Sequence, residues 1–364
     1  MTDWDAAIVG SGPAGSVAAM VLARAGRRVV LLDDLASVRA AGARKVGESL
    51  PGAARPLLRD LGLEDVVAQA GHLPLHGTLS AWGSSRLDTR DALSCPNGAG
   101  WHLDRLRFDA DIRATAIDAG AVHHEARVAT VESAPQGWRV HSRHPDDGAS
   151  EHHARWVIDG TGRRAAIARA AGISRARDDR LVALCAWTSQ SPTDDTRTLI
   201  EAVPDGWWYT AGLPDGGRVV VLHVDAADAK QVLHTPGDWR ARLDATVHVR
   251  RVVGDAALVA GPRATEACGG CLDAFAWDGG LAVGDAALSF DPLSSQGMLN
   301  ALYTGLRGAQ AVDAALGGDL RAVRAYNQQL HGVRAAYLRH HRVFYAAERR
   351  WADAPFWHDR QATA

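Results

Sequence analysis

The stretch AAIVGSGPAG, residues 6–15, decides the fold. Its first four residues are apolar, as in a buried strand, and the remaining six form a Gly-x-Gly-x-x-Gly pattern. Residues 16–25 then predict an apolar helix that stops at Gly26, and residues 29–32 predict a second strand that ends at Asp33. Strand, glycine turn, helix, strand and acid follow one another in this order in a dinucleotide-binding βαβ unit.

The residue types of this turn suit a phosphate. Gly10 permits the tight turn, Gly12 lets the backbone approach a pyrophosphate, and Gly15 lets the helix pack closely on the strand. The helix N-terminus offers free N–H groups to the phosphates, and the acid after the second strand accepts ribose hydroxyls. The predicted cofactor-binding residues of this unit are Gly10, Gly12, Pro13, Ala14, Gly15 and Asp33.

Composition narrows the class of protein. The chain has 364 residues, 47% of them apolar, and a net charge of −2, which gives no electrostatic case for nucleic acid as a partner. No apolar run is long enough for a membrane span, and the first residues show no leader-like pattern. Four cysteines make no disulfide framework, and Cys268–Cys271 is interpreted as a turn, so we predict no metal site and a cytoplasmic protein.

Three further segments extend the pattern along the chain. They are WHLDR at 101–105 with FD at 108–109, DGTG at 159–162 after an apolar strand, and GD at 284–285 followed by the loop DPLSSQGM at 291–298. With the glycine turn, they make the chain resemble the FAD-dependent monooxygenases of the aromatic hydroxylase type, which share a fold with flavin-dependent halogenases. The resemblance covers most of the chain and selects FAD rather than NAD as the bound nucleotide.

The resemblance implies an α/β fold, with a Rossmann-type FAD-binding domain, an inserted antiparallel β-sheet domain for the substrate and a C-terminal helix. We expect the FAD-binding domain in residues 1–75, 96–178 and 275–320, the substrate domain in 76–95 and 179–274, and a helical segment in 321–364. Alternating or β-branched runs at 181–189, 198–203 and 219–224 predict strands of the inserted sheet. Apolar spacing predicts one long helix over 322–350, with Pro355 marking its end.

The family assigns roles to residues in these motifs. The Gly-Asp acid, here Asp285, holds hydroxyls of the FAD ribityl chain, and the helix after the loop points its N-terminus at the flavin ring. The further cofactor-binding residues implied are Ser49, Arg105, Val128, Asp159, Gly160, Gly284, Asp285, Pro292, Gln296, Gly297 and Met298. Taken alone, Asp285 could also cap a helix, Arg105 could lie at the surface, and Asp159 with Gly160 could form a structural turn.

The resemblance also implies a reaction. Reduced flavin and O2 form a hydroperoxide, which hydroxylates an arene in one branch and oxidises halide in the other. Halogenases then use a lysine in a tunnel, but residues 52–103 contain none, and the only lysines are Lys45 and Lys230. Ser294 stands where tryptophan halogenases have a glutamate, and their Trp-x-Trp-x-Ile-Pro stretch is altered at 206–214. Halogenation is therefore disfavoured, which leaves oxygen insertion or dehydrogenation. The expected reaction is hydroxylation, with electrons from NAD(P)H or from a separate flavin reductase.

The motif set looks most like the tryptophan-modifying flavoproteins that mature quinone-cofactor oxidases, which implies an indole substrate, free or carried by a peptide or protein. The candidate substrate-binding residues are Trp82, Trp207, Tyr209 and Ser294. The candidate catalytic residues are Glu48, His102 and His223, which could donate, accept or orient a proton. The tryptophans and histidines could equally be satisfied core residues, and Glu48 could lie in a solvated loop.

Two other functions stay open at this level. One is an FAD-dependent reductase of a C=C bond, resembling geranylgeranyl reductases. The other is a flavoprotein that chaperones a partner oxidase without turnover.

Overall fold

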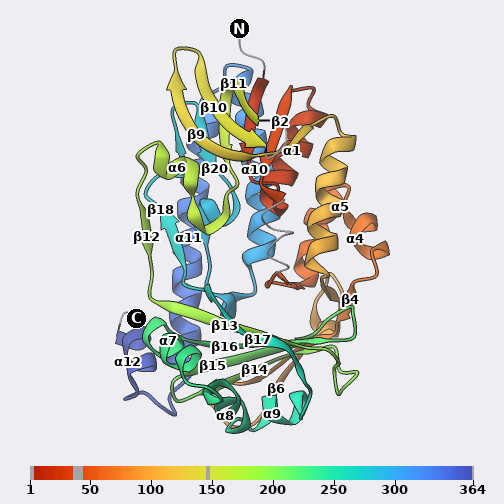
Figure 1. The fold of residues 1–364 in the computed structure, drawn as a ribbon, viewed down its shortest axis with the longest axis vertical. Coiled ribbons are helices and arrows are strands. Elements are labelled where there is room, and N and C mark those ends of the chain that lie inside the picture. Colours follow the sequence, from red (N-terminus) through yellow and green to blue (C-terminus); the bar gives the residue numbers. More distant parts are fainter. Residues whose placement is uncertain (1–3, 36–43, 145–147, 363–364) are drawn as a thin grey trace.

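Two sheets dominate the structure, a computed structural model that describes residues 4–35, 44–144 and 148–362. Predictions for residues 1–3, including the lack of a leader there, fall outside the described residues. The larger sheet occupies the upper half of the molecule and a seven-stranded sheet crosses the lower half (Figure 1). The long helix α11 (Arg321–Ala347) runs from one to the other (Figure 1).

The larger sheet is the predicted dinucleotide-binding sheet. Its strands lie in the order β19-β20-β11-β1-β2-β8, with β10 and β9 added beside β11. The members β20, β11, β1, β2 and β8 pair in parallel, which confirms the Rossmann-type α/β fold. The strands are β1 (Trp4–Val9), β2 (Val29–Asp33), β8 (Val122–Glu125), β9 (Arg127–Ala134), β10 (Gly137–His144), β11 (Gly148–Asp159), β19 (Ala276–Trp277) and β20 (Gly280–Ala282).

Both faces of this sheet are covered, which explains why β1 is apolar at every position from 6 to 9. Ala6 and Ile8 pack into the core formed with the helices, whereas Ala7 and Val9 pack toward the β9–β10 hairpin. The helix α1 contacts both α5 and α10. The helices of this part are α1 (Pro13–Arg24), α3 (Arg55–Leu61), α4 (Glu64–Gln69), α5 (Arg105–Asp118), α6 (Ala166–Ala170) and α10 (Gly297–Leu316).

Two three-stranded sheets connect the large sheets. The first has the order β3-β7-β4 and the second the order β12-β18-β21. Their strands are β3 (Ser49–Leu50), β4 (Leu73–Leu75), β7 (Gly100–His102), β12 (Arg175–Arg177), β18 (Gly270–Leu272) and β21 (Leu288–Ser289). The first sheet leads the chain from residue 49 toward α5, which begins where the Asp104 carboxylate accepts hydrogen bonds from the N–H groups of Leu106 and Arg107.

The seven-stranded sheet has the order β17-β13-β16-β15-β14-β5-β6. Its strands are β5 (Gly77–Ala81), β6 (Asp88–Asp91), β13 (Leu181–Thr188), β14 (Thr198–Val203), β15 (Gly206–Gly212), β16 (Arg218–Asp225) and β17 (Leu258–Glu266). One face packs on the short helices α7 (Ala226–His234), α8 (Asp238–Asp244) and α9 (His248–Val253). The other face is turned toward the part of the molecule that holds the larger sheet with α1, α5 and α10, which we call the FAD-type domain (Figure 1). The predicted division of the chain into domains stays a proposal.

The C-terminal region differs from the single helix that the spacing predicts. The helix α11 ends at Ala347, and Pro355 begins a second helix, α12 (Pro355–Ala362), instead of marking an end. Proline suits the first turn of a helix because its missing N–H would have no partner there. Trp357 of α12 is fully buried, and its indole N–H donates to the carbonyl of Val203 at 2.9 Å. None of the helices in the described ranges is both long and apolar enough to cross a bilayer.

A methyl group at Gly15 tests the close packing of α1 on β1. A Cβ there would lie 1.9 Å from the carbonyl oxygen of Gly10, so the backbone must move. We expect Gly15→Ala to lower the free energy of unfolding by about 2–4 kcal/mol and to weaken retention of the cofactor. The matched control is Gly332→Ala in α11, where nothing lies within 4 Å of the new Cβ and stability should rise by about 0.5–1 kcal/mol. Urea denaturation measures both, and equal stability of the two variants would contradict the packing argument.

Candidate functional site

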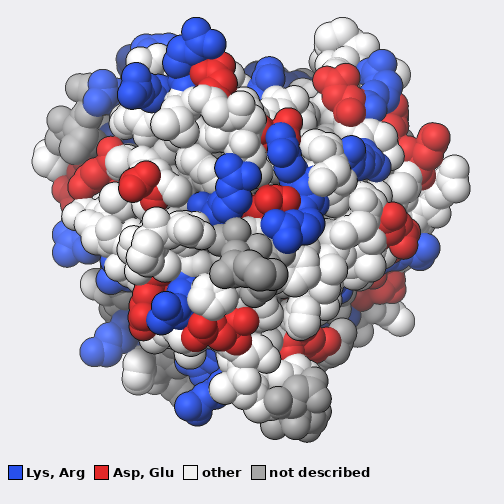
Figure 2. All heavy atoms as spheres, turned by 90° about the horizontal axis from the view of Figure 1, so that it is seen from above, with Lys and Arg blue, Asp and Glu red and all other residues white. Residues whose placement is uncertain are grey.

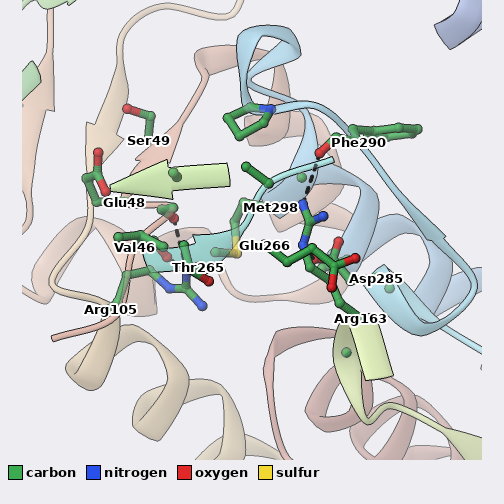
Figure 3. A pocket seen from close by; sticks show the side chains of 18 of the residues that line it. Val46, Glu48, Ser49, Arg105, Arg163, Thr265, Glu266, Asp285, Phe290 and Met298 are labelled. Atoms are coloured by element: carbon green, nitrogen blue, oxygen red, sulfur yellow. Dashed lines mark hydrogen bonds and ion pairs between the residues drawn. The ribbon is translucent and has the colours of Figure 1, made fainter. Parts of the chain in front are cut away.

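A cavity of about 380 Å³ lies between the FAD-type domain and the seven-stranded sheet. Glu48 and Ser49 lie on one side, Asp285 and Arg163 on the other, and Met298 and Glu266 between them (Figure 3). The sheet contributes a roof of mostly small side chains, among them Ala183, Cys185 and Val221. The volume falls in the range of cofactor and ligand sites in general.

The glycine turn after β1 forms one wall. Gly10 has a positive φ of 101°, and a Cβ there would lie 2.3 Å from the carbonyl oxygen of Gly160. Gly12 has no atom within 4 Å of the place where its Cβ would be, so its surface is open to a ligand. Gly12, Pro13 and Ala14 line the cavity, and no side chain caps the N-terminus of α1. These free N–H groups and this open backbone fit the pyrophosphate of a dinucleotide.

Asp33 lies at the end of β2, outside the cavity lining. Its Oδ2 accepts hydrogen bonds from the backbone N–H and the hydroxyl of Ser11, at 2.7 and 2.5 Å. Both bonds fall on one carboxylate oxygen, so Oδ1 can accept a ribose hydroxyl. The position fits the role that the sequence predicts for Asp33.

Asp159 has another task. It is fully buried, and its carboxylate accepts hydrogen bonds from the N–H groups of Thr161, Ile167 and Ala168, all at 2.9 Å. It therefore holds the turn and the start of α6, which is the structural alternative that the sequence left open. Its neighbour Gly160 lines the cavity.

Asp285 and Gly284 line the cavity on the side of α10. Asp285 forms an ion pair with Arg163, whose Nε lies 3.3 Å from Oδ2. Arg163 also donates to the carbonyls of Phe290 and Cys268, so the guanidinium fixes this wall. Arg163 follows the DGTG motif directly and was not assigned from the sequence. A cation beside a predicted ligand acid can be recognised only once the fold brings the two together.

The loop before α10 brings some of the predicted cofactor residues to the cavity. Pro292, Gly297 and Met298 line the cavity, whereas Gln296 and Ser294 do not. The Ser294 hydroxyl instead donates to the carbonyl of Asp291 at 2.8 Å. No side chain caps the N-terminus of α10, which fits the predicted approach of the helix to the flavin ring.

Four more of the predicted cofactor residues lie away from the cavity or are engaged elsewhere. Gly10 and Gly15 shape the turn without lining the cavity, and Val128 packs beside the core around the β9–β10 hairpin. Arg105 lines the cavity but donates to the carbonyls of Val46 and Gly47, at 2.6 and 3.1 Å. Its charge is paired with Asp109, which Lys45 also contacts at 2.7 Å. Arg105 therefore braces the segment that carries Glu48.

Asp291 is a cavity residue that the sequence prediction missed. It is 1% exposed and accepts hydrogen bonds from the Leu293 N–H and the Tyr345 hydroxyl, at 2.8 and 2.7 Å. Burial alone would raise the pKa of Asp291, but hydrogen bonds and the charge of His341, 3.3 Å away, outweigh burial and lower it. A buried carboxylate thus faces the cavity beneath the roof.

Glu48, Ser49, Tyr209 and His102 form one hydrogen-bonded chain. The Tyr209 hydroxyl bonds to Glu48, and it lies 2.8 Å from the Ser49 hydroxyl, which is 3.2 Å from His102 Nδ1. His102 Nε2 lies 2.8 Å from the carbonyl of Thr196. Glu48, Ser49 and Tyr209 line the cavity, and His102 lies behind them, fully buried.

The positions of the protons in this hydrogen-bonded chain follow from the pKa shifts and from the bonding partners. Burial lowers the pKa of His102, so the ring is neutral, and Nε2 must carry its proton because a carbonyl can only accept. Nδ1 is then an acceptor for the Ser49 hydroxyl. Burial and the Glu48 carboxyl raise the pKa of Tyr209 well above its usual value, so the phenol keeps its proton. The hydroxyls of Ser49 and Tyr209 therefore supply two protons to three hydrogen bonds, those between Glu48 and Tyr209, Tyr209 and Ser49, and Ser49 and His102. When Glu48 takes up a proton, all three bonds have a donor: Glu48 donates to Tyr209, Tyr209 to Ser49, and Ser49 to His102.

His223 lies in the roof of the cavity and stacks on Trp207, with ring centroids 3.6 Å apart. It is 3% exposed, and no hydrogen-bond partner of its Nδ1 is found in the described chain. Burial lowers the pKa of His223 to about 3, although the charge of Asp291 acts against the shift. At neutral pH the ring is therefore uncharged.

Trp82 and Trp207 do not line the cavity. The Trp207 indole N–H donates to the Tyr345 hydroxyl at 3.3 Å, and the Trp82 ring meets Trp357 edge-on at 5.2 Å. Both tryptophans thus join an aromatic cluster with the end of α11 and with α12. Of the predicted aromatic substrate residues, only Tyr209 faces the cavity.

The four cysteines are free thiols. Burial raises the pKa of both Cys185 and Cys268 to about 12, so neither is a thiolate at neutral pH. In the described ranges, no group of His, Cys, Asp and Glu residues is arranged to hold a metal ion. The side chains that remain for chemistry in the cavity are carboxyls, hydroxyls and a neutral imidazole.

The chain is similar in sequence and fold to known FAD-dependent proteins. A family model described as an FAD binding domain matches residues 3–301. The putative FAD-dependent oxidoreductase LodB of Marinomonas mediterranea is 28% identical over 377 residues, which cover 100% of this chain and 98% of LodB. Among solved structures, the myxobacterial chondrochloren halogenase CndH has a TM-score of 0.88 at 25% identity, covering 98% of this chain and 86% of that one. The peptidyl tryptophan dihydroxylase QhpG, with a TM-score of 0.79 at 24% identity and coverage of 99% and 79%, shares the fold.

Removal of the Asp285 carboxylate tests the cofactor side of the cavity. We expect Asp285→Ala to raise the Kd of FAD about tenfold, because it removes a charged hydrogen-bond acceptor from the cavity wall. Asp278→Ala removes an exposed acid between β19 and β20 and serves as the control. Fluorescence quenching of FAD during titration measures both affinities. Equal affinities for the two variants would exclude Asp285 as a ligand.

The buried imidazole of His223 should impose a pH dependence on stability. In the unfolded chain the imidazole binds a proton near pH 6.5, but in the folded protein only near pH 3. Stability from this group is complete above pH 6.5 and declines as the pH falls toward 3, by about 1.4 kcal/mol per pH unit. The variant His223→Phe keeps the stack on Trp207 and removes this slope. Denaturant unfolding between pH 4 and pH 7 compares the two, and parallel curves would contradict the assignment.

Proposed function

The chain belongs to the FAD binding domain family and is an FAD-dependent oxidoreductase, and from this premise we propose a monooxygenase that hydroxylates an electron-rich aromatic ring. The proposed substrate is an indole, free or carried by the tryptophan of a peptide. Bound FAD, once reduced, would supply the two electrons with which one atom of O2 enters the ring and the other leaves as water. NAD(P)H or a separate flavin reductase supplies the electrons.

The observation that carries the proposal is the chemistry of the cavity beneath the roof. Beneath the roof the lining includes three acceptors: the carboxyls of Glu48 and Asp291 and the neutral imidazole of His223. An indole has a single polar group, an N–H donor, and otherwise an apolar ring. Acceptors set among Ala183, Cys185 and Val221 therefore fit an indole better than they fit an acid or a phosphate.

The lysines support oxygen insertion over halogenation. Lys45 Nζ lies 2.7 Å from the Asp109 carboxylate, outside the lining of the cavity. Lys230 belongs to α7, which packs on the opposite face of the seven-stranded sheet. Neither lysine lines the cavity, where a halogenase would use one.

The residues around the cavity then have definite roles in the reaction. The neutral imidazole of His223 accepts the substrate N–H and orients the ring under the roof. Hydroxylation leaves the attacked ring carbon with an extra proton, which Glu48 accepts at the carboxyl oxygen bonded to Tyr209. On that transfer, Tyr209 donates to Ser49 and Ser49 donates to His102 Nδ1, so no buried polar group is left without a partner. The roof and the Glu48 segment cover two sides of the cavity.

Product analysis tests the proposed function. The purified protein should carry the visible absorption of bound FAD. With a reductant and O2, we expect a tryptophan-containing peptide to gain the mass of one oxygen atom per turnover, measured by mass spectrometry. Saturation of a C=C bond without O2 uptake would identify a reductase instead. A stable complex with a partner oxidase, without substrate-stimulated NAD(P)H consumption, would identify a chaperone.

Tyr209→Phe tests the proton chain. It removes the hydroxyl that links Glu48 to Ser49, and we expect kcat to fall by about 10²-fold with FAD affinity unchanged. The solvent isotope effect on kcat should change as well, since no Tyr209 hydroxyl is left to turn from Glu48 toward Ser49. Tyr303→Phe in α10, whose hydroxyl bonds to Gln329, is the control. A Tyr209→Phe enzyme with unchanged kcat and isotope effect would remove the chain from the mechanism.

A further inference from the structure

The strand β17 forms one edge of the seven-stranded sheet. In residues 4–35, 44–144 and 148–362 it pairs only with β13, so its outer side has no strand partner there. Most of its residues are exposed. The opposite edge, β6, has four residues, of which Asp88, Arg90 and Asp91 carry charges, as edges protected against pairing usually do.

The hydrogen-bond pattern shows which backbone groups of β17 point outward. The N–H of Ala267 donates to the carbonyl of Leu181 in β13, at 3.0 Å. Bonded pairs alternate in an antiparallel ladder, so Thr265 opposite Ala183 and Arg263 opposite Cys185 are also bonded inward. The N–H and C=O groups of Ala264 and Glu266 therefore face away from the sheet.

The same segment borders the cavity. Thr265 and its partner Ala183 both line it, and Thr265 is exposed whereas Ala183 is buried. The cavity thus reaches the protein surface along this part of β17, and Figure 3 shows Thr265 in its wall near Val46. Side chains opposite one another on neighbouring strands share a face. A strand added to β17 would place the residue opposite Thr265 at the mouth of the cavity.

Arg263 adds a charge to this edge. It precedes Thr265 by two residues, so its side chain leaves the strand on the same face, and it is exposed. No carboxylate in the described chain pairs with it. In an added strand, the residue two positions from the one opposite Thr265 would lie opposite Arg263. An acidic side chain at that position would face the Arg263 guanidinium.

We propose that residues 263–266 bind an acidic peptide segment as an added β-strand, which delivers an aromatic side chain from beside Thr265 into the cavity. This rests on the proposed function and specifies its substrate as peptide-borne. Main-chain bonds to Ala264 and Glu266 supply affinity, and the cavity supplies the choice of side chain. Pro262, which cannot donate, bounds the segment on one side.

Two probes and two variants test this docking in the FAD-loaded enzyme. The peptide probe is acetyl-Ser-Val-Asp-Thr-Trp-Thr-Asp-Val-Ser-amide, and the small probe is N-acetyltryptophan amide. Ala264→Pro removes one outward N–H without touching the ladder to β13, and Ala264→Val keeps that N–H as the control. We expect Ala264→Pro to raise the KM of the peptide about fivefold, the effect of one hydrogen bond, while the small probe keeps its kcat and KM.

Charge reversal supplies an independent readout. Arg263→Glu should raise the KM of this peptide about threefold and lower the KM of the peptide with lysines in place of its aspartates. The docking proposal would be overturned if Ala264→Pro affected both probes equally or affected neither. It would also be overturned if both peptides responded in the same way to Arg263→Glu. Oxidation of the small probe alone would also overturn it. Failure to oxidise either probe would refute the proposed function itself, which separates the two conclusions.

Discussion

The structure depends on a contact between bare backbone segments at the end of β1. Gly10 lies against the carbonyl of Gly160, and Gly15 lies against the carbonyl of Gly10, at distances that exclude any side chain. The contact joins β1, α1 and the end of β11. It leaves the first N–H groups of α1 without caps at the cavity wall. Gly284 approaches Ala14 in the same way, since a Cβ there would lie 2.7 Å from that of Ala14, and so α10 begins beside the same cavity.

This part of the site could be predicted because its information is local. A strand, a glycine turn and a helix follow one another within residues 6–25, and the backbone geometry of the turn dictates its residue types. The fold class was confirmed for that reason. The tasks of single acids were harder to predict, because a sequence shows that an acid is present but not what its oxygens accept. Asp159 follows a strand as Asp33 does, yet α6 and the turn occupy its carboxylate.

The roof side of the cavity could not be assembled from the sequence. Ser49 and His102 are paired across β3 and β7, but Tyr209 reaches Glu48 and Ser49 only when the seven-stranded sheet closes over the FAD-type domain. Strand alternation does separate Trp208, which faces the short helices, from Trp207 and Tyr209 on the other face. It cannot reveal that the indole N–H of Trp207 donates its hydrogen bond to the hydroxyl of Tyr345, 138 residues away. Which aromatic residue stays available to a substrate is set by the C-terminal helices.

The electrostatics of the cavity connect these contacts to the choice of reaction. The cations in its wall are both engaged, Arg105 with Asp109 and Arg163 with Asp285. Burial lowers the pKa values of His102 and His223, so neither imidazole adds a positive charge at neutral pH. A halide ion entering beneath the roof would meet the Asp291 carboxylate without a free cation among the described lining residues to compensate it. An uncharged aromatic ring with an N–H donor meets no such penalty, and the same burial that removes the positive charges leaves the neutral imidazole of His223 as an acceptor for that donor.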